Sequence, residues 1–208
     1  MYCHKCGEKT SEEFCGKCGT KIIQSDSIII KSWRNEEDYN KIIKHPNVLG
    51  LISEYSRKST NKLSGEELIN KFDLVFGTVT GLSLGVLTEI TVPIYSRLGI
   101  KTGKSKYKRF NESIQELFVK AMCSLSKNNH PIEEFHKAKD GIILIGKIKS
   151  DLRSFGGNVL IELNKNDDFV NAKVQTVIKG QIFDWGKSKN IVKSIFEDLQ
   201  NIDLRHDT

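Results

Sequence analysis

Four cysteines near the N-terminus have the types and spacing of metal ligands. Cys3 and Cys6 form one Cys-x-x-Cys pair, and Cys15 and Cys18 form a second pair twelve residues later. Each copy reads aromatic-Cys-x-Lys-Cys-Gly-x-Lys, and the Gly can accept a positive φ in the turn that brings two sulfurs together. Four thiolates suit tetrahedral Zn²⁺ and leave no open coordination position. We therefore predict one structural zinc ion.

Residues 2–22 resemble the small zinc-ribbon modules found at the N-termini of many bacterial and archaeal proteins. The positions that carry the resemblance are Cys3, Cys6, Gly7, Cys15, Cys18 and Gly19. The resemblance implies a zinc ion that supplies the folding energy of a segment too short to build a core. It implies no single function, because such ribbons serve as nucleic-acid-binding, protein-docking or purely structural modules.

The positive charge of the chain is concentrated in one segment. The formal net charge is +6, and residues 97–109 alone hold six basic residues and no acid. These candidate anion-binding residues are Arg97, Lys101, Lys104, Lys106, Lys108 and Arg109. Tyr107 and Phe110 alternate with them, a pattern that suits nucleic-acid backbones or anionic lipid headgroups. The alternative is a solvated linker or a lysine-protected sheet edge.

Residues 74–96 are apolar and carry Glu89 as their one charge. Two interpretations stay open: a buried helix packed closely through Gly81 and Gly85, or a membrane contact. We favour the buried helix, because Glu89 in a bilayer would cost about 3 kcal/mol and Pro93 would break the helix. The N-terminus lacks the apolar stretch of a secretory signal, so we expect a cytoplasmic protein, with peripheral membrane association as the alternative.

The rest of the chain predicts an α+β fold with a C-terminal antiparallel sheet and two covering helices, in the order β-α-β-β-β-β-α. The expected strands are residues 105–110, 132–139, 142–149, 159–163 and 169–178, and the expected helices are residues 111–126 and a last helix capped by Ser188. Two short helices precede them, one capped by Asn35 and ending at His45, and one over residues 47–57. This element order resembles TATA-binding-protein-like and helix-grip folds.

The predicted domains are a zinc ribbon (1–23), a connector and helical region (24–100) and an α+β domain (101–208). Nothing in them indicates catalysis: two Gly-Lys-Ser sequences lack the earlier Gly of a phosphate-binding loop, and His136 and His206 have no acid or nucleophile at a recognisable spacing. We therefore expect no enzyme and no small-molecule substrate. The expected function is non-enzymatic binding, with a protein partner first. The alternatives are nucleic acid, through the ribbon and residues 97–109, and a membrane surface, through residues 74–109.

Overall fold

Five antiparallel strands form the centre of the fold. The computed structural model describes residues 3, 8–20, 32–59, 105–150, 155–178 and 186–205. The strands are β1 (Ser105–Phe110), β2 (Ile132–Ala138), β3 (Gly141–Ile148), β4 (Gly157–Lys165) and β5 (Val170–Ile178). They lie in the order β1-β5-β4-β3-β2, so β1 and β2 are the two edges of the sheet.

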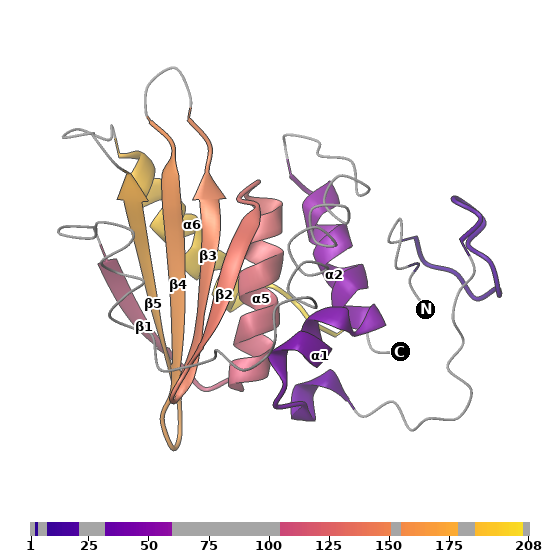
Figure 1. Cartoon of the computed structure of the whole chain (residues 1–208), viewed down its shortest axis with the longest axis horizontal. Helices are drawn as coiled ribbons and strands as arrows, with labels where there is room; N and C mark the ends of the chain where they lie inside the picture. The colour runs from indigo at the N-terminus through magenta and orange to yellow at the C-terminus, as the bar shows by residue number, and fades with distance from the viewer. Residues whose placement is uncertain are drawn as a thin grey trace.

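Two helices cover one face of this sheet. They are α5 (Ile114–Lys127), which follows β1, and α6 (Lys187–Asn201), which follows β5. Figure 1 shows α6 behind the sheet and α5 beside it. The order β1-α5-β2-β3-β4-β5-α6 confirms the predicted α+β class and element order.

A second helical layer packs on the other side of α5. It contains a 3₁₀ turn, η1 (Trp33–Asn35), and the helices α1 (Tyr39–Lys44) and α2 (Pro46–Arg57). Figure 1 shows α5 between α2 and the sheet, and every residue from 117 to 126 is buried. The sequence pattern predicts one apolar face for α5. Val119, Met122 and Cys123 lie outside that face and are buried as well, because the helix is covered from two sides.

Helix starts differ from their predicted positions. Asp38, not Asn35, caps α1, because Ser32 caps the preceding turn η1 and the Asp38 carboxylate accepts the Asn40 N–H at 2.9 Å. Helix α5 begins three residues after the predicted start, with a capping box between Ser113 and Glu116. Gly186, in the left-handed region at φ 81°, precedes α6 in place of the predicted Ser188 cap.

The two faces of the sheet differ in their surroundings. The inner face packs on the helices, and a Cβ on Gly146 would lie 2.9 Å from Leu125 of α5. On the outer face, Ile143, Ile145 and Leu160 are at most 2% exposed, so the centre of this face is apolar and buried. Polar side chains surround this apolar centre on the same face, among them His136 of β2, Glu162 of β4 and Lys173 of β5.

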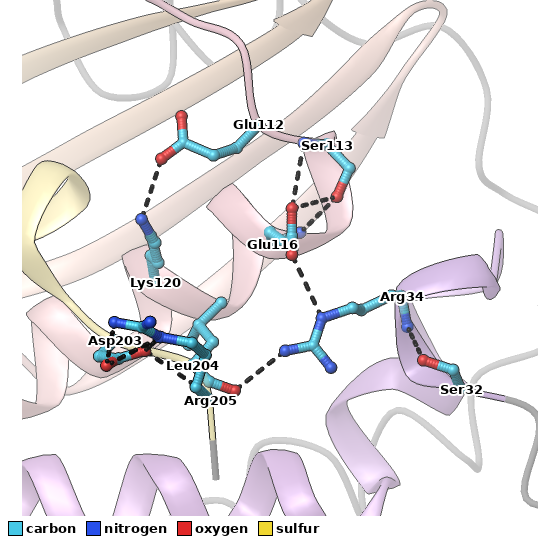
Figure 2. A network of polar contacts seen from close by, with 9 residues as sticks. All are labelled: Ser32, Arg34, Glu112, Ser113, Glu116, Lys120, Asp203, Leu204 and Arg205. Atoms are coloured by element: carbon cyan, nitrogen blue, oxygen red, sulfur yellow. Dashed lines mark hydrogen bonds and ion pairs between the residues drawn. The ribbon is translucent and has the colours of Figure 1, made fainter. Parts of the chain in front are cut away.

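Arg34 joins three distant segments of the chain. Its Nε donates to Glu116 Oε1 at 3.2 Å, and its Nη2 donates to the backbone oxygen of Leu204 at 2.9 Å (Figure 2). Glu116 also accepts from Ser113 at the start of α5, as the same view shows. The contacts fix η1 and the C-terminal segment against the N-terminal end of α5.

No helix within the described part of the chain is long and apolar enough to cross a membrane. Residues 74–96 lie outside that part. The two interpretations of residues 74–96, buried helix and membrane contact, therefore stay predictions.

Candidate metal centre

Three of the four predicted metal ligands lie together. The Sγ atoms of Cys3, Cys15 and Cys18 are all within 4.8 Å of one another, and those of Cys3 and Cys18 are 3.5 Å apart. Cys3 and Cys15 are each 1% exposed, although the surrounding residues are mostly exposed. The fourth predicted ligand, Cys6, lies outside the described residues.

The twelve-residue sequence repeat is also a structural repeat. The backbone N–H of Cys3 donates to the oxygen of Glu8 at 2.8 Å, and the N–H of Cys15 donates to the oxygen of Thr20 at 2.9 Å. Both bonds span five residues, and their ends are twelve residues apart. The first cysteine of each pair therefore donates to the carbonyl oxygen five residues later in both copies.

A glycine is required in the second turn. Gly19 has φ +68°, in the left-handed region that side chains other than glycine rarely adopt, and its N–H donates to the oxygen of Cys15 at 2.8 Å. This conformation closes the chain behind Cys18. The prediction that the Gly after each pair relieves the turn is confirmed at Gly19, and Gly7 lies outside the described residues.

The sulfur geometry fits a metal better than a disulfide. A disulfide bond joins its sulfurs at about 2.05 Å, whereas the edge of a tetrahedron with Zn–S bonds of about 2.3 Å is about 3.8 Å. The 3.5 Å between Cys3 and Cys18 is close to the second distance. An all-sulfur donor set also suits borderline and soft metals. The cluster can therefore hold a metal ion.

Polar contacts surround the cluster. The side chains of Cys18 and Thr20 form a hydrogen bond, with Sγ and Oγ1 3.2 Å apart. The Glu8 carboxylate forms ion pairs with Lys17 at 3.2 Å and with Arg57, at the end of α2, at 3.7 Å. Since Glu8 follows the first cysteine pair, these contacts connect the first turn to the second turn and to the helical layer.

The predicted anion-binding residues fall into two groups. Lys106, Lys108 and Arg109 belong to the edge strand β1, while Arg97, Lys101 and Lys104 lie outside the described residues. Lys106 and Arg109 are exposed and Lys108 is half-buried. The basic segment therefore contributes its last part to a sheet edge, at a position from which a macromolecule can be contacted.

Sequence analysis missed one histidine–carboxylate pair. His136 Nε2 lies 2.8 Å from Glu134 Oε2 on β2, because residues two apart in a strand share a face. The spacing of two residues between Glu134 and His136 in a predicted strand was the signal that could have revealed this pair. Across the strands, the partners of these residues are Ile143 and Ile145 of β3, which offer no nucleophile.

Comparison of the chain with protein-family models, with curated proteins and with solved structures gave no match.

Proposed function

We propose that the N-terminal module binds one structural Zn²⁺ through Cys3, Cys6, Cys15 and Cys18, and that the chain is a non-enzymatic binding protein. The observation that carries the metal site is the convergence of three sulfurs within 4.8 Å of one another. Two of these cysteines are buried in a segment with no other buried hydrophobic cluster among its described residues. A metal would supply the cohesion that such a small core lacks.

Cys6 is the proposed fourth ligand because of the repeat. Cys3 and Cys15 occupy equivalent positions and make equivalent backbone hydrogen bonds. Cys6 stands in the first copy where Cys18 stands in the second. Four thiolates fill the tetrahedral shell of Zn²⁺, so the module has no position left for a substrate or an activated water.

The proposal of binding without catalysis also rests on the α+β part. The His136–Glu134 pair is the one histidine–carboxylate pair within the described residues, and it faces Ile143 and Ile145. The exposed basic residues of β1 instead suit an anionic macromolecule, which favours nucleic acid among the partner classes.

Metal analysis tests the zinc module. Protein purified without added metal should hold about one Zn²⁺ per chain, and Cys15→Ser should lose it. Cys123→Ala is the matched control, because this buried cysteine lies in α5 and should leave the metal content unchanged. Wild-type protein that is free of metal, with a folded N-terminal module, would refute the site.

A further inference from the structure

An exposed aromatic side chain lies among cations on the outer face of the sheet. Tyr107 of β1 is 68% exposed, the most exposed large hydrophobic side chain in the described part of the chain. It pairs with Lys173 of β5, and the next outward residue of β1, Arg109, pairs with Asn171. Since residues two apart share a face, Tyr107, Arg109, Asn171 and Lys173 form one strip along the edge, here called the β1–β5 strip.

The cations of the β1–β5 strip lie over aromatic rings. Lys173 Nζ is 5.7 Å from the centre of the Tyr107 ring, and the Arg109 guanidinium is 4.8 Å from the centre of the Phe169 ring. Glu162 lies 3.4 Å from Lys173 and offsets part of its charge. Lys106 and Lys108 alternate with these residues along β1 and therefore lie on the opposite face of the sheet, outside the strip. The local charge is therefore positive, with aromatic rings inside it.

Protection of the sheet edge against pairing with other chains explains why lysines occur on β1, but it does not explain why Tyr107 is exposed there. Lysines on an edge strand prevent pairing with other chains. A large exposed ring on the same strand works against that protection, because it offers apolar surface. An aromatic face next to cations does suit a nucleobase stacked on the ring, with its phosphates near the cations.

We propose that the β1–β5 strip binds single-stranded nucleic acid, with a base stacked on Tyr107 and phosphates held by Arg109 and Lys173. A single strand fits better than a duplex, because the bases of a single strand are free to stack on a side chain. This inference rests on the proposed function as a binding protein and names its partner. It does not depend on the metal.

Fluorescence anisotropy with the full chain tests the proposal. The probes are a fluorescein-labelled 20-nucleotide oligo(dT), its RNA counterpart and a duplex of equal length, each at low and high salt. We expect the single strands to bind more tightly than the duplex, and the logarithm of the binding constant to fall linearly with the logarithm of the salt concentration. Tyr107→Ala should weaken binding about 5- to 150-fold, the range for loss of one stacked base, while Tyr107→Phe should retain it.

Matched variants separate stacking from charge. Arg109→Ala should weaken binding and reduce its salt dependence, whereas Lys137→Ala, an exposed lysine on the opposite edge strand, should change little. Absence of single-strand binding at low salt, equal binding by Tyr107→Ala, or tighter binding to the duplex or to phosphatidylserine vesicles would overturn the proposal. Zinc content measured on the same samples separates this failure from failure of the zinc module.

Discussion

The Sγ atoms of Cys3 and Cys18 lie 3.5 Å apart, although fifteen residues separate them in the chain. A metal ion would explain why these sulfurs lie so close together in a small hydrophilic segment. Thiolates repel one another, and thiols form only weak hydrogen bonds. The proposed zinc module therefore depends on the metal.

Thr20 should tune the metal site. Its Oγ1 lies 3.2 Å from Cys18 Sγ, and a hydrogen bond to a ligand atom orients the ligand and stabilises its charge. Thr20→Val should lower zinc affinity about 10-fold, as loss of outer-shell contacts does. Competition with a chromophoric chelator measures the change.

The matched control for Thr20 is another threonine of the module. The Thr10 hydroxyl accepts from the N–H of Glu12 at 3.2 Å and makes no hydrogen bond to the sulfur of Cys3, Cys15 or Cys18, the cysteines of the module that the structure describes. Thr10→Val should leave zinc affinity close to that of the wild type. Equal zinc affinities for Thr20→Val and Thr10→Val would show that the Thr20 hydroxyl does not stabilise the metal site.

Asp198 should be the most costly polar residue to remove between α5 and α6. Its carboxylate is buried and accepts from Ser124 Oγ at 2.8 Å and Asn128 Nδ2 at 2.7 Å, and it pairs with Lys127. Asp198→Ala leaves these donors without their acceptor, so the free energy of unfolding should fall by about 2–4 kcal/mol. Urea unfolding measures it.

The neighbouring residue provides the comparison for Asp198. Glu197 is exposed and pairs with Lys193 on the surface of α6. Glu197→Ala should change the free energy of unfolding by less than about 0.5 kcal/mol. A loss for Asp198→Ala as small as this would contradict a stabilising role for the buried carboxylate.

Acidification should destabilise the protein through His130. Burial lowers the pKa of His130 below its ordinary value of 6.5, and Lys187 and Lys149 act in the same direction. The unfolded chain then binds a proton at higher pH than the folded chain does. Stability is therefore lost as the pH falls below about 6.5, by at most about 1.4 kcal/mol per pH unit for this group.

His130→Gln should flatten this pH dependence. The comparison is the change in free energy of unfolding between pH 7.5 and pH 5.5, measured in urea for the wild type and the variant. The variant should lose less stability on acidification, while His45, whose pKa burial also lowers, continues to contribute. An unchanged pH dependence in the variant would show that His130 is not a source of it.

Sequence periodicity was sufficient to predict the α+β architecture. The predicted strand over residues 169–178 is β5, and the last helix predicted near Ser188 is α6. These patterns arise because one side of each element faces the core. The spacing of the apolar residues therefore matches the repeat of the backbone, two residues in a strand and 3.6 in a helix.

Features set by several elements together were not predictable. The burial of Cys123 and Met122 depends on α2 packing on α5, which the sequence of α5 alone cannot reveal. The start of α1 depends on a competition between Ser32, Asn35 and Asp38 for free backbone N–H groups. In the metal centre, the spacing of the cysteines was sufficient to predict that Cys3, Cys15 and Cys18 lie together.

The most direct test of the zinc site is X-ray absorption at the zinc edge of the purified full chain. The account predicts about four sulfur ligands at about 2.3 Å, and a lower sulfur count when Cys6 is replaced by Ser. Three or fewer sulfurs with nitrogen or oxygen ligands in the wild type, or a Cys6→Ser spectrum identical to that of the wild type, would contradict the four-cysteine site.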